Sequence, residues 1–336
     1  MDCYIPGLPR KILVQKGSIE NIKEFSSGFG KEFLIVADNI TKKLGAEKMQ
    51  SELGGDLILI SDSTLDEVKK VERSKADCII SFGGGKVIDV GKLAAHNKKV
   101  PFISCPTTCS NDGIASANAS ITVDGKYTSF NSSSPVAVIA DLNLISKSPY
   151  RLLASGAADV LSNYTAIADW KIASKNNKEA YNPNIAQLAL FAADIVCNNS
   201  KKIKNLEEDG LKTFVWSLIF SGMSMSLHNS SRPASGAEHM FSHALDKIGN
   251  FGLHGEQVGI GTIFFSYLHG SGWGKIKNTL KEIEAPTNIK EINLDKETFI
   301  QAMLEAKDIR KRYTILDEKP LNKEIVLKIA AETGII

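Results

Sequence analysis

Short apolar runs alternate with amphipathic stretches through the first 150 residues. The runs are rich in Ile, Val, Leu and Phe, the pattern of strands that are buried on both faces. In the stretches between them, apolar residues recur with the helical period. Strands that alternate with helices predict a mostly parallel sheet that helices cover on both faces. The expected strands are 33–37, 57–60, 78–82, 100–104 and 135–141, and the expected helices are 41–53, 64–74 and 86–96. The turn signal Asp124-Gly125, between segments 121–123 and 127–130, predicts a hairpin.

The pattern changes after Pro149, where strand-like runs largely disappear and helical periodicity dominates. The longest apolar run, Phe214 to Leu227, contains four serines and is too short and too polar to cross a bilayer. We therefore expect a buried helix there and no transmembrane segment. The expected helices cover 151–175, 184–199, 211–228, 236–247, 256–269, 275–283, 297–311 and 323–332. The fold class is α/β, with a parallel-sheet nucleotide-type domain over 1–148 and an all-helical domain over 149–336.

Composition narrows the partners of the chain. Over 336 residues the net charge is only +2, and the lysines are scattered, which argues against nucleic acid as a partner. The five cysteines form no CxxC pair, and their number is odd. Together with the lack of a signal peptide, this usage is typical of a reducing compartment, so we expect a cytoplasmic protein with free thiols.

Three of the six histidines gather in one short segment. His239 and His243 are four residues apart, so on a helix they share one face. His254 follows the glycine-containing stretch 249–252, which could turn the chain back toward that face. With an acidic partner such as Asp159, these histidines predict a catalytic zinc site with an open position for substrate. The alternative is two buried histidines with ordinary hydrogen bonds and one surface histidine.

The acidic partner lies in an apolar helical pattern. Asp159 and Asn163 are four residues apart within 151–175, so they share one face of the expected helix. A buried carboxylate needs a partner because an unpaired buried charge is costly, and a metal ion would supply one. Exposure of Asp159 at a helix start is the alternative.

Three consecutive glycines join an expected strand to an expected helix at Gly83 to Gly85. Glycines allow close approach of the backbone, and the free N–H groups of a helix start attract phosphate. The segment is neither the GxGxxG fingerprint nor a Walker A loop. Phosphate binding and a tight structural turn therefore stay two open interpretations.

Polar residues follow two other expected strands. The loop from Ser104 to Gly113 is rich in hydroxyl groups, and a loop at the carboxyl end of a parallel strand is well placed to hold a ligand. The same residue types also favour capped turns. Asp38 follows the strand 33–37, where it could accept hydrogen bonds from a ribose or cap the next helix.

These motifs together resemble the iron/zinc-dependent alcohol dehydrogenase superfamily, which includes glycerol dehydrogenases and dehydroquinate synthases. The glycine loop and His254-Gly255-Glu256 are typical of the whole superfamily. The segments that begin at Asn111 (Asn-Asp-Gly-Ile-Ala-Ser) and Arg232 (Arg-Pro-Ala-Ser-Gly) resemble the archaeal-type sn-glycerol-1-phosphate dehydrogenases. The resemblance extends over nearly the whole chain. It implies a dehydroquinate synthase-like fold, in which 1–148 binds the dinucleotide and 149–336 binds metal and substrate.

The resemblance also implies roles for particular residues. Zinc is held by Asp159, His239 and His254, and Asn163 stands where many alcohol-oxidising relatives have a fourth ligand, a histidine. His243 and Asp112 are the expected catalytic residues. The expected substrate contacts are Asp112, Asp159, His243 and Arg232, and the expected NAD(H) or NADP(H) contacts are Asp38, Gly83, Gly84, Gly85, Lys86, Val87, Ile88, Asp89, Thr107, Thr108, Ser110 and Ser116.

The implied activity is zinc-dependent reduction of dihydroxyacetone phosphate to sn-glycerol 1-phosphate by NADH or NADPH, for the backbone of ether phospholipids. Zinc would polarise the carbonyl, and His243 would bind a hydroxyl or pass a proton. Arg232 is proposed for the substrate phosphate, with a loop salt bridge as its alternative. The other readings are a glycerol dehydrogenase, a dehydroquinate synthase-like lyase and a nucleotide-binding module without catalysis. A homo-oligomer is also compatible with the sequence.

Overall fold

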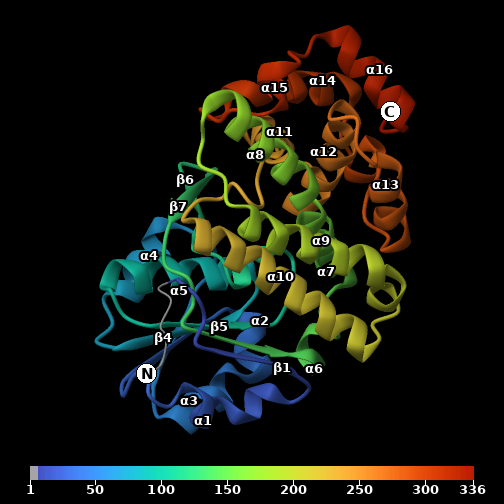
Figure 1. Ribbon diagram of the computed structural model, residues 1–336. Helices are drawn as coiled ribbons and strands as arrows, with labels where there is room; N and C mark the ends of the chain where they lie inside the picture. The colour runs from blue at the N-terminus through green and yellow to red at the C-terminus, as the bar shows by residue number, and fades with distance from the viewer. Residues whose placement is uncertain (1–6) are drawn as a thin grey trace. The chain divides into compact units, whose positions relative to one another are not determined.

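The computed structural model describes residues 7–336, with Tyr127 described by its backbone only (Figure 1). Contacts divide the chain into two compact units, which meet in sequence between Tyr150 and Arg151.

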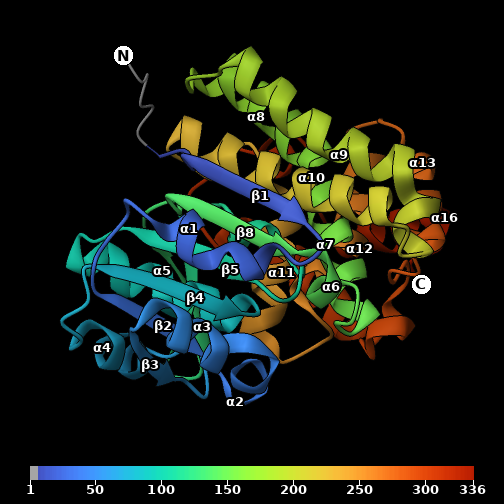
Figure 2. The same cartoon turned by 90° about the horizontal axis from the view of Figure 1, so that it is seen from below.

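The first unit contains a six-stranded sheet in which every neighbouring pair of strands is parallel. The strand order is β1-β8-β5-β4-β2-β3 (Figure 2). A separate antiparallel pair, β6 and β7, forms the predicted hairpin around Asp124-Gly125. The strands are β1 (Lys11–Gln15), β2 (Phe33–Ala37), β3 (Asp56–Leu59), β4 (Cys78–Gly83), β5 (Phe102–Pro106), β6 (Asn118–Val123), β7 (Lys126–Asn131) and β8 (Ala137–Asp141). The prediction of a mostly parallel sheet is confirmed.

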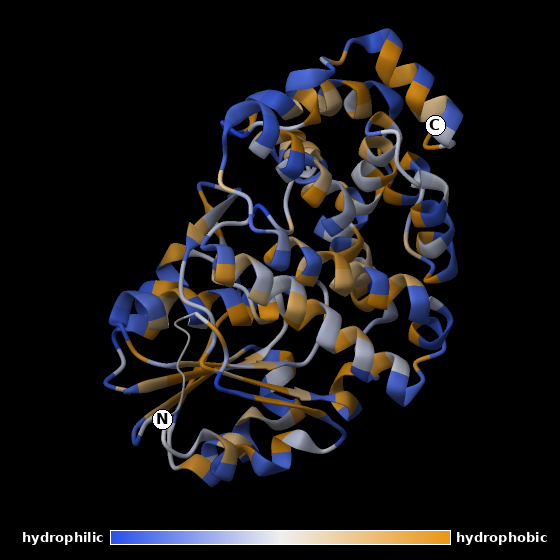
Figure 3. Ribbon diagram, in the orientation of Figure 1, coloured by the Kyte–Doolittle hydropathy of each residue, from blue (hydrophilic) through white to orange (hydrophobic). Residues whose placement is uncertain are grey.

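Two apolar cores, one on each face of this sheet, explain the continuous hydrophobic runs of its strands. Leu34 and Val36 belong to one buried cluster, and Ile35 and Ala37 of the same strand belong to the other. Figure 3 shows the strands as predominantly hydrophobic. The helices of this unit are α1 (Ile22–Ser26), α2 (Asn39–Thr41), a π-helical turn (Lys42–Ala46), α3 (Glu47–Leu53), α4 (Leu65–Glu72), α5 (Gly85–Lys98) and α6 (Leu142–Ile145).

One strand escaped the sequence analysis. β1 lies at an edge of the sheet and pairs only with β8, with Leu13 opposite Ile139. Its apolar stretch is three residues long between Lys11 and Gln15, and only Val14 is buried. An edge strand needs fewer apolar residues than a central one, so its pattern is weak.

The second unit is helical throughout, as predicted. Its central helix α11 contacts α8, α12 and α14, and Phe241 of α11 meets Phe299 of α14 edge to face at 5.6 Å. No helix among the described residues is both long enough and apolar enough to cross a membrane. The helices are α7 (Tyr150–Leu161), α8 (Asn163–Asn177), α9 (Pro183–Lys204), α10 (Glu208–His228), α11 (Ala237–Ile248), α12 (His254–Leu268), α13 (Trp273–Glu282), α14 (Lys296–Glu305), α15 (Ile315–Glu318) and α16 (Lys323–Thr333).

The prediction of a single helix over 151–175 was wrong. The helix is interrupted at Ser162, whose backbone N–H and hydroxyl both donate to the carbonyl of Asp159. A hydroxyl that binds a nearby carbonyl competes with the helical ladder, which explains the break. Asp159 therefore lies on α7 and Asn163 on α8. The Asn163 amide donates to the Ala189 carbonyl and to the Ser221 hydroxyl.

Candidate functional site

Three ligand-type side chains from three helices of the second unit meet at one point. Asp159 comes from α7, His239 from α11 and His254 from the first position of α12. One ligand atom from each lies within 4.8 Å of the other two. The Asp159 Oδ1 atom is 3.4 Å from His239 Nε2 and 3.8 Å from His254 Nε2. The structure thus brings together the three residues predicted to hold a metal.

A buried carboxylate fixes the ring of His239. His239 Nδ1 lies 3.0 Å from Oε1 of Glu238, and the Thr165 hydroxyl and the Gly236 N–H also donate to this carboxylate. Burial alone would raise the pKa of Glu238, but the hydrogen bonds, that from His239 foremost, hold it below its ordinary value. The ionised carboxylate accepts a hydrogen bond from the N–H group at Nδ1, so in the neutral ring the lone pair of Nε2 is directed at Asp159.

A chain of hydrogen bonds fixes the ring of His254 in the same tautomer. The NH2 group of the Gln257 side chain donates to the Phe251 carbonyl, which identifies the other terminal atom of Gln257 as the oxygen, an acceptor. The Ser242 hydroxyl donates to that oxygen at 2.6 Å and therefore accepts from His254 Nδ1 at 3.1 Å. The Nε2 atom of His254 then also presents a lone pair to Asp159.

Two imidazole lone pairs that face one carboxylate oxygen need a positive charge between them. Burial opposes a charged ring, but the hydrogen bonds to Asp159 and Glu238 raise the pKa of His239 to about 9, so a proton can supply the charge. A metal ion is the alternative source. Ligand atoms of a tetrahedral zinc ion lie roughly 3.3 Å apart. The distances from Asp159 fit such an ion with little movement.

A glycine and an ion pair between the exposed Arg151 and the buried Glu256 hold His254 at the start of α12. Gly252 has φ of 69°, a left-handed conformation that favours glycine, and a Cβ atom there would lie 2.7 Å from the Glu256 carboxylate. Glu256 accepts the backbone N–H of Leu253 and a bidentate pair of bonds from Arg151. These contacts explain the turn that the glycine-containing stretch predicted.

His243 lies beside the cluster on the face of α11 that it shares with His239. Its ring centre is 6.4 Å from that of His239 and 5.9 Å from that of His254. Burial is the main cause that lowers the pKa of His243, with a contribution from the charge of Arg310, and the Asp246 carboxylate opposes it. A neutral imidazole next to the cluster is suited to accept or donate a proton.

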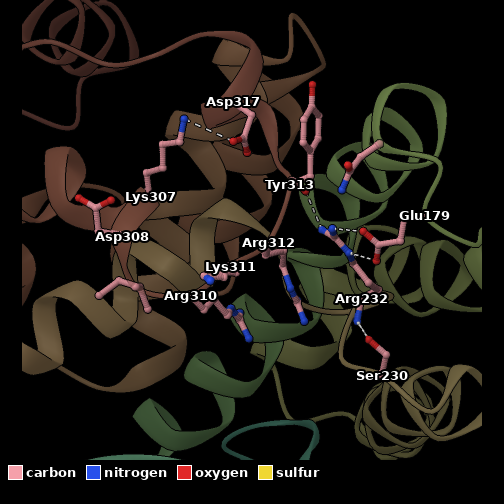
Figure 4. A pocket seen from close by; sticks show the side chains of 12 residues that line it. Glu179, Ser230, Arg232, Lys307, Asp308, Arg310, Lys311, Arg312, Tyr313 and Asp317 are labelled. Carbon is pink, nitrogen blue, oxygen red and sulfur yellow. Dashed lines mark hydrogen bonds and ion pairs between the residues drawn. The ribbon is translucent and has the colours of Figure 1, made fainter.

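The structure pairs Arg232 with a carboxylate of the protein. Its guanidinium donates two hydrogen bonds to Glu179 and one, at 2.8 Å, to the Tyr313 carbonyl (Figure 4). This is the loop salt bridge that the sequence left open as the alternative for Arg232. The sequence analysis missed Arg310 and Arg312, which line the same cavity as Arg232.

In the first unit, the glycine loop connects β4 to α5 as predicted. A Cβ atom on Gly83 would lie 2.6 Å from the side chain of Val87, so the turn into the helix needs glycine there. Gly84 caps α5, and Ile88 donates to its carbonyl. The same loop approaches the Thr108 hydroxyl, since a Cβ atom on Gly84 would lie 3.2 Å from it. Ser110 lies near Gly85 in the same way.

The hydroxyl-rich loop after β5 lies beside the glycine loop. The Thr107 N–H donates to the Gly83 carbonyl at 3.0 Å. Asp112 opens a short 3-10 helix, and its carbonyl accepts the N–H of Ser116. Thr107 and Ser116 are buried, whereas Asp112 is only half-buried. The loop after β5 therefore lies next to the start of α5, and it carries Thr107, Thr108, Ser110, Asp112 and Ser116.

Three other expected cofactor residues have partners within the protein. Asp38 caps α2, with Oδ1 accepting the N–H groups of Ile40 and Thr41. Lys86 pairs with Asp62 at 2.7 Å. Asp89 lies 3.4 Å from the ammonium of Lys92. Lys92 is fully buried and was missed from the sequence, although it also donates to the carbonyls of Gly113 and Asn118 and so ties α5 to the loop that carries Asp112.

Solved structures of the same fold include several dehydrogenases. A probable glycerol dehydrogenase from Sinorhizobium meliloti matches with a TM-score of 0.81 at 19% identity and covers 99% of this chain and 100% of its own. Glycerol dehydrogenase from Schizosaccharomyces pombe has the same TM-score at 17% identity and covers 99% and 91%. These matches confirm the predicted fold class, a parallel sheet followed by a helical region, and show that glycerol dehydrogenases share it.

Sequence comparisons point to one branch of this fold. The family model of iron-containing alcohol dehydrogenases matches residues 14–149. Glycerol-1-phosphate dehydrogenase [NAD(P)+] of Pyrococcus furiosus is 42% identical over 99% of this chain and 100% of its own length. That of Methanosarcina acetivorans is 40% identical over 98% and 96%. With such identity over nearly the full length, the chain belongs to the glycerol-1-phosphate dehydrogenase family, as its motifs predicted.

Proposed function

We propose that the protein reduces dihydroxyacetone phosphate to sn-glycerol 1-phosphate with NADH or NADPH, and that zinc is its metal. The single observation that carries the metal part is the convergence of Asp159, His239 and His254, since one ligand atom of each lies within 4.8 Å of the other two. The full-length similarity to enzymes named glycerol-1-phosphate dehydrogenase [NAD(P)+] supports the substrate and the cofactor. The product would supply the glycerophosphate backbone of ether phospholipids. The described cysteines are all free thiols, which agrees with the cytoplasmic location that we propose.

Asp159, His239 and His254 would hold the zinc ion. Two neutral imidazoles and one carboxylate are a common donor set for catalytic zinc, and they leave a position for the substrate. When bound, zinc would supply a Lewis acid to the carbonyl oxygen of the ketone. Glu238 and Ser242 keep the two rings in the metal-binding tautomer. Asn163, at the position of the fourth ligand in many relatives, is engaged with Ala189 and Ser221.

The start of α5 would hold the cofactor. Backbone N–H groups in the first turn of α5 and the positive end of the helix suit a pyrophosphate, and the glycines let it approach closely. Ile88 would line this site, but its own N–H already donates to the Gly84 carbonyl. Thr107, Thr108 and Ser116 would contact the ribose or the nicotinamide, which supplies the hydride when bound. Three further cofactor contacts proposed from the sequence are Asp38, Lys86 and Asp89, and they would bind the cofactor in addition to their partners within the protein. Gly83 and Ser110 would also contact the cofactor.

His243 and Asp112 would handle the hydroxyl groups of the substrate. When the hydride reaches the carbonyl carbon of the ketone, the carbonyl oxygen becomes negatively charged, and His243 can donate a proton to it. In the reverse reaction His243 would accept that proton. Its ring lies close enough to His239 and His254 to reach a substrate that is bound at the cluster. Asp112 would orient a hydroxyl group of the substrate.

A spectrophotometric assay tests the proposed function. Zinc-replete protein should oxidise NADH or NADPH in the presence of dihydroxyacetone phosphate, and the product should be sn-glycerol 1-phosphate. Dihydroxyacetone should be a poor substrate, because it lacks the charged group. Turnover of dihydroxyacetone alone would show a glycerol dehydrogenase instead, and no turnover of either ketone would leave the lyase or a non-catalytic module.

The His254→Ala variant should bind zinc poorly and lose nearly all turnover, because it removes one of three protein ligands. Metal analysis after dialysis and the ketone reduction assay measure the two effects. His96→Ala is the matched control, since His96 is an exposed histidine of α5 whose Nδ1 atom lies 2.8 Å from the Ser133 hydroxyl. A His254→Ala protein with full zinc content and full activity would remove His254 from the ligand set.

Zinc affinity should depend on pH through His239. Its pKa of about 9 means that a proton occupies the ring at neutral pH and that zinc must displace it. Apparent affinity should rise by roughly tenfold for each pH unit between about pH 6 and 8. Burial lowers the pKa of His254 to about 4, so this ring releases no proton in that range. Competition with a chelator at several pH values measures the slope, and an affinity independent of pH would contradict the account.

The His243→Ala variant should bind zinc normally but turn over about 10²–10⁴ times more slowly, because it lacks the proton-transfer group. Steady-state kinetics and metal analysis separate these effects. Unchanged turnover would exclude His243 from the reaction, whereas loss of zinc would make it a structural residue of the cluster.

A further inference from the structure

Two arginines of the second unit are held in place without a carboxylate partner. One Arg310 guanidinium nitrogen donates to the Ser235 hydroxyl at 2.5 Å. Arg312 donates to the Ser235 carbonyl at 2.5 Å and to the Ser231 hydroxyl at 2.8 Å. All of these acceptors are neutral. Among residues 7–336, neither arginine has an acidic group within ion-pair distance.

The neighbouring Arg232 has the carboxylate partner that Arg310 and Arg312 lack among the described residues. Its guanidinium is fully buried and is neutralised by Glu179 through two hydrogen bonds. Figure 4 shows Arg232 turned to Glu179, while the side chains of Arg310 and Arg312 extend together in another direction. Charge that is withdrawn from water normally needs a paired charge. The two remaining arginines are half-buried, so they have unused capacity for an anion.

Burial and mutual repulsion make this pair of cations costly. Burial lowers the pKa of Arg310 to about 10, with repulsion from Arg232 in the same direction and the charge of Glu238 opposing both. Burial and the charges of Arg310 and Arg232 lower the pKa of Arg312 to about 9. The Nε atom of Arg310 is also buried without a hydrogen-bond acceptor. A group with several acceptor oxygens and negative charge would relieve both the repulsion and the unmade hydrogen bond.

Arg310 lies within electrostatic range of the histidine cluster. Arg310 acts electrostatically on His243 and on Glu238, the residue that orients His239. Ser235, which binds both arginines, comes directly before Gly236, the cap of α11. A cavity of about 970 Å³ borders both arginines, so a small ligand has room beside them.

We propose that Arg310 and Arg312 bind the phosphate group of the substrate and thereby select a phosphorylated ketone over its unphosphorylated form. The forked guanidinium groups suit the geometry of a phosphate monoester, and the Ser231 and Ser235 hydroxyls hold them in position. The identity of the ligand rests on the proposed function, whereas the existence of an anion site at the two arginines does not. Arg232 lines the same cavity as a structural residue, paired with Glu179.

The test compares Arg310→Gln and Arg312→Gln with Lys311→Gln. Lys311 is the matched control because it is an exposed cation between the two arginines. The probes are inorganic phosphate, measured by titration calorimetry on zinc-loaded protein, and dihydroxyacetone phosphate and dihydroxyacetone as substrates. Each arginine variant should bind phosphate and use dihydroxyacetone phosphate, judged by kcat/KM, roughly 10- to 100-fold less well, as expected for loss of a hydrogen bond to a charged group. Activity on dihydroxyacetone should be unchanged, and Lys311→Gln should match the wild type throughout.

Other outcomes would overturn the proposal. Phosphate binding that survives in both glutamine variants would place the anion elsewhere, and an equal loss of kcat/KM on both ketones would make the arginines structural. If the glutamine variants fail to retain zinc, Arg310→Lys and Arg312→Lys carry the test. They keep the charge without the fork, so they should bind phosphate more weakly than the wild type, and unchanged binding would contradict the proposal. A wild type that binds phosphate through the two arginines but reduces only dihydroxyacetone would refute the proposed function while it supports the anion site.

Discussion

The orientation of two imidazole rings is the constraint on which the second unit depends. His239 and His254 each donate their Nδ1 proton away from Asp159, to Glu238 and to Ser242, so both Nε2 lone pairs face the same carboxylate oxygen. Without a cation between them this arrangement would be repulsive. Three helices, a helix break at Ser162 and a left-handed glycine all serve to hold it. Such buried polar networks are costly when incomplete, which indicates that the cluster is built around a positive charge.

The sequence predicted much of the site because its signals are local. The spacing of His239 and His243, the turn before His254 and the glycine loop at Gly83 each depend on a few neighbouring residues, and the helix and strand periods follow from burial. The proposed metal ligands, taken as a set, depend instead on the resemblance to a known family. Asp159 is far from the histidines in sequence, and no local pattern joins it to them. The parallel sheet was likewise visible in the apolar runs, except for the edge strand β1.

What the sequence could not show is which of several partners a polar side chain takes. Asp38 caps a helix, Lys86 pairs with Asp62 and Arg232 pairs with Glu179, each as one of two chemically reasonable choices. The fully buried Lys92 looks like an ordinary surface lysine of an amphipathic helix until the carbonyls of Gly113 and Asn118 are seen around it. Arg310 and Arg312 carry no motif, and only the fold brings them to the loop before α11.

X-ray absorption spectroscopy at the zinc edge, on protein purified with zinc and checked for metal content, tests the central claim most directly. The account predicts one zinc ion per chain with only nitrogen and oxygen neighbours at about 2.0–2.1 Å and the multiple-scattering signature of two imidazoles. A shell of sulfur neighbours at about 2.3 Å would contradict the account, and so would a protein that retains no metal after purification with zinc.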